Sequence, residues 1–245
     1  MSSLQEILKN IKKYETAVVQ QEFKSKKHAV GLVLFKGKTQ VFKRYLPEYF
    51  SHMLQEYMIL SISMPSVTKP IVLKKDDVHH LLILSYIPGV NLCDMINDHS
   101  ITIEEKLRLV KLLARWFVSF HSYAKNHHGC IIRGDSNLRN FLCNDKIWGV
   151  DFEESRSGKP EEDISQLCVS LLATDPMFTN EKFDLAQLFI TEYEQGSSRN
   201  LSDINRYIGS ALDDLMIRRT ANKNVLQRYR DEIVNKNIFL HSSIK

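Results

Sequence analysis

Paired cysteines and long apolar runs are both missing from this sequence of 245 residues. The four cysteines are widely spaced and form no Cys-x-x-Cys pair, which argues against a zinc ribbon and indicates reduced, mostly buried thiols. No run approaches the roughly 20 apolar residues that a membrane-spanning helix requires. Residues 1–13 are polar and carry lysines, without the apolar core of a signal peptide. We therefore expect a soluble, cytoplasmic protein with no membrane span.

Internal repeats, low-complexity stretches and long linkers are also missing, so we expect one unit of two lobes. Charge is uneven along the chain: residues 1–88 carry 13 Lys and Arg against 7 Asp and Glu, and the remainder carries 20 against 22. A basic first third suits an anionic ligand, although a solvated lysine-rich surface would give the same count. Nucleic acid is not the expected partner, because no helix-turn-helix, zinc-finger or aromatic-interleaved basic pattern is present.

The first third of the sequence predicts a small sheet with one helix. Runs of β-branched and aromatic residues predict strands, and the polar links at 24–27 and 36–38 suit hairpin turns. Pro47 is well placed to open a helix that continues to residue 61. The predicted strands cover residues 17–19, 29–35, 39–45, 71–73 and 81–84.

Beyond Pro88-Gly89 the sequence becomes largely helical. Residues 103–122 carry apolar side chains at helical spacing, including Leu113 and Phe117. Further helices are predicted over residues 163–172, 181–193, 201–219 and 225–234. The chain therefore divides into an N-terminal lobe, 1–88, with a small antiparallel β-sheet and one helix, and a mostly helical C-terminal lobe, 89–245. This is an α+β architecture.

Two carboxylates and a carboxamide lie at the ends of short apolar segments in the middle of the chain. Asp135 and Asn140 follow one segment, and Asp151 ends the next one, after a hairpin-like turn at 144–146. Such a layout can bring three oxygen-bearing side chains to one point, as hard cations such as Mg²⁺ prefer. Asp and Asn are also ordinary loop residues, so the rest of the chain must supply the context.

This pattern resembles the catalytic loop and metal-binding Asp of the protein-kinase-like superfamily. The resemblance is to its phosphotransferase branch, which includes aminoglycoside, choline and Kdo kinases and the minimal kinase of the KEOPS complex. The family pattern reads His-Gly-Asp, four residues, Asn, and then a strand ending in Asp-Phe. The resemblance implies a bilobal kinase-like fold in which Asp135 is the catalytic base and Asn140 and Asp151 hold Mg²⁺. The matching positions are Gly134, Asp135, Asn140, Asp151 and Phe152.

The same resemblance implies an ATP site in the first lobe. Lys43 lies late in the third strand, where the family carries its phosphate-binding lysine, and alternation puts it on one face with Val41. A lysine on an inward face needs an anionic partner, for which Glu56 in the following helix is the candidate. Ser85 and Ile87 fall where the family binds adenine through backbone groups.

The sequence departs from the family at two places. It has no GxGxxG between the first two strands, where the link is lysine-rich, so the groups that cover the phosphates stay unassigned. Arg133 replaces the family's His and, being always charged, requires acceptors around it. Arg139 resembles the arginine of tyrosine-kinase catalytic loops and is expected to meet the γ-phosphate or the substrate, or else to pair with a nearby acid. His121 is expected to be a packed structural residue.

The resemblance implies an ATP- and Mg²⁺-dependent phosphotransferase that moves the γ-phosphate to a hydroxyl of a small molecule or sugar. Two alternatives stay open: a minimal atypical Ser/Thr protein kinase of the KEOPS type, with a protein partner, and a non-catalytic nucleotide-binding pseudokinase. Glu161 follows Asp151 by only ten residues, which favours a small-molecule enzyme over a protein kinase with a long activation segment. Four glutamates nearby predict an acidic side for a cationic or hydroxyl-rich acceptor, or interact with a helix dipole: Glu153, Glu154, Glu161 and Glu162.

Overall fold

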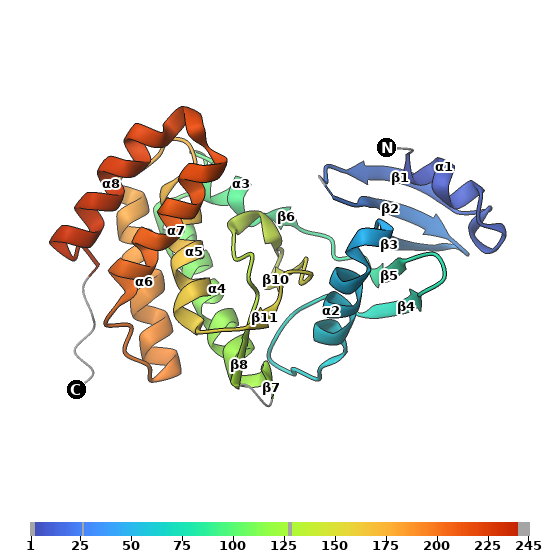
Figure 1. Ribbon diagram of the computed structural model, residues 1–245, viewed down its shortest axis with the longest axis horizontal. Helices are drawn as coiled ribbons and strands as arrows, with labels where there is room; N and C mark the ends of the chain where they lie inside the picture. The colour runs from blue at the N-terminus through green and yellow to red at the C-terminus, as the bar shows by residue number, and fades with distance from the viewer. Residues whose placement is uncertain (1–2, 26, 127–128, 240–245) are drawn as a thin grey trace. The chain divides into compact units, whose positions relative to one another are not determined.

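The computed structural model describes residues 3–25, 27–126 and 129–239 and divides into two compact units (Figure 1). The first unit comprises Met1–Ile62, Lys69–Pro88 and Val150–Glu154. The second comprises Ser63–Thr68, Gly89–Gly149 and Ser155–Lys245. The chain therefore returns to the first unit for five residues that include Asp151.

A five-stranded antiparallel sheet forms the first unit, in the order β1-β2-β3-β5-β4. The turn between β2 and β3 has two residues, Lys36 and Gly37, both with positive φ. Glycine adopts that conformation without a steric penalty, which makes it the usual residue of such hairpins. The strands are β1 (Val18–Phe23), β2 (Ala29–Phe35), β3 (Lys38–Arg44), β4 (Val72–Asp76) and β5 (Leu81–Ser85).

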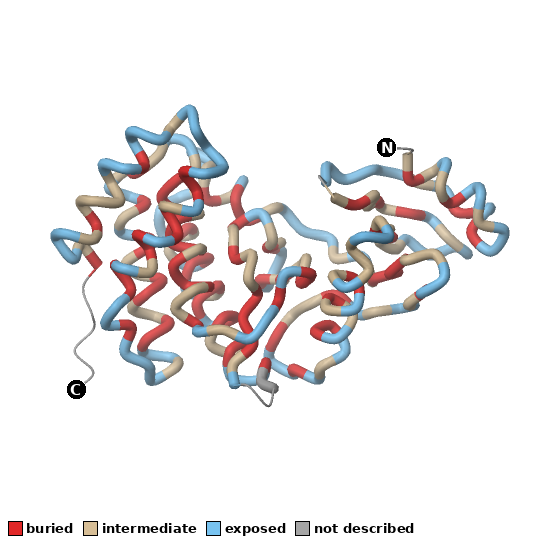
Figure 2. Tube along the Cα trace, in the orientation of Figure 1, coloured by how far each residue is buried: buried red, intermediate tan, exposed pale blue. Residues whose placement is uncertain are grey.

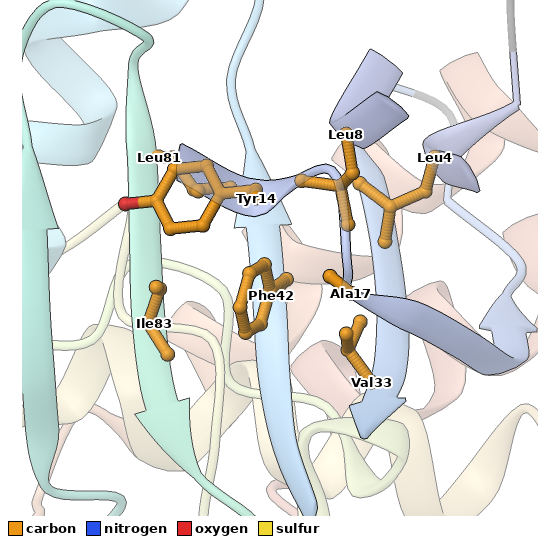
Figure 3. Close-up of a cluster of buried hydrophobic side chains, with 8 residues drawn as sticks. All are labelled: Leu4, Leu8, Tyr14, Ala17, Val33, Phe42, Leu81 and Ile83. Atoms are coloured by element: carbon orange, nitrogen blue, oxygen red, sulfur yellow. The ribbon is translucent and has the colours of Figure 1, made fainter. Parts of the chain in front are cut away.

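The two faces of this sheet have different covers. Lys43 faces helix α2 (Phe50–Ser61), which a short 3-10 turn, η2 (Pro47–Tyr49), precedes. The next residue back, Phe42, points to the opposite face, as strand alternation requires. There it meets helix α1 (Leu4–Lys9) and the turn η1 (Lys12–Tyr14), which close a buried apolar cluster. Figure 3 shows its members: Leu4, Leu8, Tyr14, Ala17, Val33, Phe42, Leu81 and Ile83.

The N-terminal segment is an addition that the sequence did not lead us to expect. Two apolar residues, Leu4 and Leu8, are one helical turn apart and are fully buried. A Cβ atom at Gly31 would come within 2.8 Å of both the Gln21 carbonyl and the Leu4 side chain, so the glycine allows β1 and α1 to approach β2 closely. The side chain of Gln5 also bonds the backbone at both Ala17 and Val19, which fixes α1 to β1.

The second unit is mostly helical, and its buried residues follow the inner sides of the packed helices (Figure 2). Helix α4 packs against α6, and α5 contacts both α6 and α7. Small antiparallel pairings, β9 with β10 and β8 with β7 and β11, hold the central loops. The helices are α3 (Leu92–Asn97), α4 (Ile103–Tyr123), α5 (Pro160–Leu172), α6 (Asn180–Ser197), α7 (Ile204–Arg218) and α8 (Lys223–Lys236). The strands are β6 (Val90–Asn91), β7 (Lys125–Asn126), β8 (Gly129–Ile132), β9 (Phe141–Cys143), β10 (Ile147–Gly149) and β11 (Arg156–Ser157), and the remaining 3-10 turns are η3 (Leu138–Asn140) and η4 (Thr220–Asn222).

The predicted α+β class is confirmed, and most elements lie where the sequence placed them. The strand predicted at 29–35 matches β2, and the turn predicted at 144–146 joins β9 to β10. Helix α5 begins three residues earlier than predicted, because Pro160 occupies its first position. Within the described part of the chain, no helix is long and apolar enough to cross a membrane.

Candidate functional site

Lys43 is the centre of a buried charge network in the first unit. Its ammonium lies 2.8 Å from a Glu56 oxygen, 2.6 Å from Asp151 and 2.7 Å from Glu153. Burial alone would lower the pKa of Lys43, but the carboxylates of Glu56 and Asp151 raise it well above its usual value. The Tyr45 hydroxyl also donates to Glu56. The ion pair between Lys43 and Glu56 that the sequence suggested is therefore present, and the lysine is fixed in its charged form.

Glu153 is part of this network, which the sequence did not reveal. It was predicted to contribute to an acidic side, but its side chain is only 7% exposed and contacts His28 Nε2 at 2.9 Å as well as Lys43. Although burial opposes ionisation, these contacts lower the pKa of Glu153 to about 2. Glu154 pairs with Lys27 at 2.5 Å. Glu153 is therefore buried against cations and does not contribute to an acidic surface, whereas Glu154 is exposed and pairs with Lys27.

Glu162, in the first turn of α5, is engaged as well. It bonds the Arg156 guanidinium at 2.7 Å and its own helix at the Lys159 amide. Its role is therefore that of a helix cap and surface ion pair.

Asp151 occupies an unusual backbone conformation directly after β10. Its φ is +64°, a left-handed value that few non-glycine residues adopt and that aspartate tolerates better than most. The next amide, of Phe152, donates to Glu56 at 3.2 Å, and the Phe152 ring is fully buried. Glu56 thus holds both Lys43 and the turn that presents Asp151. Strained backbone held this firmly is characteristic of functional sites.

The segment after β5 contains the two residues predicted to bind adenine. Ser85 still belongs to the sheet, because its amide donates to the Ile71 carbonyl and its hydroxyl accepts from the Ile71 amide. Ile87 lies beyond the strand, and its amide and carbonyl have no hydrogen-bond partner among residues 3–25, 27–126 and 129–239. Ile87 thus offers open backbone groups, whereas the amide and hydroxyl of Ser85 are already used.

Asp135 belongs to a separate cluster in the second unit, on the loop between β8 and η3. Its two carboxylate oxygens accept hydrogen bonds from the side-chain amides of Asn137, at 2.9 Å, and Asn140, at 3.1 Å. Asn140 also bonds the Asp135 carbonyl at 3.0 Å. Asn140 uses its side-chain nitrogen, Nδ2, in both bonds. Its side-chain oxygen, Oδ1, can therefore face another group, as a metal ligand requires.

One face of α5 holds this loop, and this is the feature that sequence reasoning missed. Three polar residues, Asp163, Gln166 and Ser170, lie at helical spacing and accept backbone amides. Asp163 accepts from Arg133 and Gly134 at 2.7 and 3.1 Å. Gln166 accepts from the amide of Ser136 at 2.9 Å, and Ser170 from that of Leu138 at 3.0 Å. Four loop amides are therefore positioned by a single helix.

Asp163 is ionised although it is fully buried. Burial raises the pKa of a carboxylic acid, but here the hydrogen bond from His121 and the loop amides lower the pKa of Asp163 below its usual value. His121 Nε2 lies 3.0 Å from Asp163, and Nδ1 lies 2.9 Å from the Tyr193 hydroxyl. Both ring nitrogens of His121 therefore have a buried hydrogen-bond partner. His121 is thus a buried structural residue, as the sequence suggested.

The two arginines of the loop have opposite surroundings. Arg133 is 1% exposed, and its guanidinium lies 5.4 Å from the centre of the Trp116 ring and 4.8 Å from that of Phe141. The sequence predicted acceptors around Arg133, and the structure adds cation–π contacts with these two rings. Arg139 is exposed, and no carboxylate of the described residues lies within ion-pair distance of it. The alternative that it pairs with a nearby acid is wrong within that part of the chain.

The predicted residues thus form two clusters. Lys43, Glu56 and Asp151 belong to the first unit, and Asp135 and Asn140 to the second. Their convergence on one Mg²⁺ stays a prediction. Among the described residues, groups of His, Cys, Asp or Glu close enough to share an ion occur only in the first unit.

Comparison with protein-family models and with curated proteins finds no match for this sequence. Solved structures do match over nearly the whole chain. The ADP and hygromycin B complex of a thermostable mutant of aminoglycoside phosphotransferase APH(4)-Ia has a TM-score of 0.63 at 12% identity, covering 96% of this chain and 98% of that one. The chain has the protein-kinase-like fold. The gentamicin complex of APH(2″)-IIa gives 0.59 at 14% identity, covering 97% and 96% of the two chains.

The resemblance to protein-kinase-like phosphotransferases is confirmed at the level of fold. A third structure, ADP-bound APH(2″)-Ib, has the same fold: it gives a TM-score of 0.60 at 14% identity and covers 95% of both chains. The predicted bilobal kinase-like arrangement, with an antiparallel sheet and one helix followed by a mostly helical part, is therefore confirmed. At such low identity the protein-kinase-like fold does not identify the reaction or its substrate.

Proposed function

We propose that this protein is an ATP- and Mg²⁺-dependent phosphotransferase that moves the γ-phosphate of ATP to a hydroxyl of a small molecule or sugar. The observation that carries the proposal is the double hold on Asp135 by Asn137 and Asn140. These amides fix the orientation of the carboxylate, so that it can accept the proton of an acceptor hydroxyl. Positioning of this kind and neutralisation of charge supply most of the catalysis in phosphoryl transfer.

In this proposal the first unit binds the nucleotide. Lys43 is charged, buried and held by Glu56, so it can contact nucleotide phosphates without a further ordering cost. The open backbone groups of Ile87 suit the edge of adenine. Two of the similar structures contain ADP.

Mg²⁺ would be held by Asp151 and by the carbonyl oxygen of Asn140. The amide nitrogen of Asn140 is committed to Asp135, which leaves an oxygen of the kind that Mg²⁺ prefers. When bound, the ion neutralises charge on the β- and γ-phosphates. Arg139, exposed and without a carboxylate partner in the described residues, is suited to the γ-phosphate or an anionic group of the acceptor.

A small acceptor is favoured by the short segment between Asp151 and α5. Residues 156–157 form β11, which pairs with β8, and α5 begins at Pro160. This leaves no length for the activation segment by which protein kinases bind peptide substrates. The active-site geometry also argues for an enzyme over a pseudokinase, because Asp135 and Asn140 are both present and mutually oriented.

The test compares Asp135→Asn with Asp145→Asn, an exposed aspartate of the β9–β10 turn. Each protein is incubated with labelled ATP, Mg²⁺ and a panel of aminoglycosides, choline, sugars and serine peptides. We expect transfer to a small alcohol, with a loss of about 10²- to 10⁴-fold in D135N and no change in D145N. Thermal stabilisation by ATP with Mg²⁺ should persist in D135N.

Two outcomes would contradict the proposal. Unchanged turnover in D135N rejects the role of Asp135 as the base. Absence of any Mg²⁺-dependent stabilisation by ATP in the wild-type chain rejects nucleotide use altogether. Transfer to serine peptides only would favour the protein-kinase alternative.

A further inference from the structure

Two histidines and a glutamate of the first unit bring their ligand atoms together beside the Lys43 network. His28 precedes β2, His52 lies in the first turn of α2, and Glu153 follows the Asp151 turn. The glutamate oxygens lie 2.9 Å from His28 Nε2 and 3.9 Å from His52 Nδ1. One ligand atom from each residue falls within 4.8 Å of the other two. We refer to these three residues as the histidine–glutamate cluster.

The hydrogen-bonding state of the cluster is incomplete. His28 is only 4% exposed, yet among the residues that the structure describes neither of its ring nitrogens has a hydrogen-bond partner of acceptable geometry. Its Nε2 is close to Glu153, but the two groups are not aligned as donor and acceptor. Ligands of a common ion have this relation, because each directs its lone pair at the ion and not at its neighbour. Buried polar atoms without partners are rare and need an explanation.

The charge around the cluster also favours a cation. Among the ion pairs of the described residues, four carboxylates lie against only two lysines, Lys43 and Lys27, so the group has an excess of negative charge. A divalent ion would balance this excess. The carboxylates are Glu56, Asp151, Glu153 and Glu154. A second group, Glu56 with Asp151 and Glu153, is also close enough to share an ion, but the Lys43 ammonium already occupies it.

We propose that the histidine–glutamate cluster binds a divalent transition-metal ion of the zinc class. Its protein ligands are the imidazoles of His28 and His52 and the carboxylate of Glu153, with water completing the shell. Two imidazoles and one carboxylate suit Zn²⁺ and similar ions, whereas Mg²⁺ prefers oxygen ligands only. Ligands about 2.0–2.2 Å from a tetrahedral ion lie roughly 3.3–3.5 Å apart, so small side-chain adjustments complete the site.

A metal ion bound at Glu153 would also affect Lys43, because both contact the same carboxylate. The same carboxylate oxygen that meets His28 also lies 2.7 Å from Lys43. A metal ion bound at Glu153 competes with Lys43 for that oxygen, which leaves the lysine to Glu56 and Asp151. Metal occupancy is thereby linked to the charge network, whatever reaction the protein performs, and it is measurable without nucleotide.

The experiment titrates the full-length chain, freed of metal by a chelator, with Zn²⁺ by calorimetry and with Co²⁺ by visible absorption. We expect one ion per chain and the intense Co²⁺ bands of four-coordinate sites. His52→Ala is the decisive variant, since the residue is part-exposed and alanine favours the helix, so folding is retained. Affinity should fall more than about 100-fold, because even groups behind the ligands are worth 10–100-fold. Glu153→Gln should have the same effect.

Adjacent histidines elsewhere are the competing explanation for any binding, and they provide the matched control. His79→Ala with His80→Ala, and His127→Ala with His128→Ala, each remove such a pair. These variants should bind as the wild type does. Binding that survives in H52A, binding lost in either control, or no binding at all would each overturn the proposal. None of these results depends on phosphotransfer, so the proposed function and the metal site stand or fall separately.

Discussion

The Lys43 network of the first unit and the Asp135 loop of the second are both polar, but different interactions hold them. The Lys43 network is held by ion pairs between side chains, because three carboxylates lie against the lysine ammonium. The Asp135 loop is held through its backbone, by amides that bond one face of α5. Side-chain ion pairs can be exchanged when a ligand arrives, whereas the backbone bonds fix a shape. The first arrangement therefore suits binding, and the second suits the positioning of a catalytic group.

Replacement of Asp163, the acceptor that two amides of the Asp135 loop share, is expected to have the largest effect on stability. Asp163→Ala takes away the partner of two loop amides and of His121. We expect the free energy of unfolding to fall by about 3–5 kcal/mol, since the buried histidine and amides lose their partner. Urea unfolding measures the loss, and hydrogen exchange should increase at the amides of Arg133 and Gly134.

The exposed Asp184 of α6 supplies the control for that variant. Asp184→Ala should change the free energy of unfolding by no more than about 0.5 kcal/mol. A loss in D163A as small as this would show that α5 does not determine the shape of the loop.

In the first unit, the stabilisation that the ion pairs of Asp76 provide should depend on pH. Burial opposes the ionisation of Asp76, but contacts with Lys13, His79 and Tyr14 lower its pKa well below the usual value. A carboxylate with a depressed pKa in the folded state stabilises the protein above its unfolded pKa, and this stabilisation disappears as the pH falls. Asp76→Asn should therefore lower the free energy of unfolding by about 2 kcal/mol at pH 7.

That difference between wild type and D76N should shrink steadily below about pH 4. Denaturant titrations at pH 7, 4 and 3 follow it. Asp77→Asn, which removes an exposed pair with Lys75, should cost less than about 1 kcal/mol. A constant difference for D76N at all three pH values would refute the ion-pair explanation.

The smallest effect is expected where a single neutral bond to the loop is removed. Ser170→Ala deletes the acceptor for the Leu138 amide and should cost about 1 kcal/mol, independent of pH. Ser122→Ala removes a hydroxyl that bonds within its own exposed helix turn and should have almost no effect. If S170A and S122A behave alike, the bond to Leu138 adds nothing to the stability of the loop.

Local features explain what could be predicted from the sequence. Strand β2 was located to the residue because its β-branched run ends at a Lys-Gly turn. The pair of Lys43 with Glu56 was implied by the resemblance to the kinase-like family, and strand alternation agreed with it. The spacing of Asp135 and Asn140 similarly placed them on one loop.

The residues that were missed depend on partners distant in the sequence. Asp163 looked like an ordinary acidic residue of a first helical turn, because the amides that it binds come from a loop some 30 residues earlier. Glu153 was expected to contribute to an acidic side or to interact with a helix dipole, because nothing local shows that Lys43 and His28 meet it. Helix α1 is short, and its two leucines are buried only because they pack against the sheet, which the local sequence does not show.

The cover that α1 provides has a practical consequence for handling the protein. Leu4 and Leu8 shield the apolar side chains of Val33 and Phe42 from water. Removal of about the first dozen residues, by proteolysis or by truncation of the gene, would therefore expose an apolar patch on the sheet. We expect such shortened chains to precipitate or self-associate.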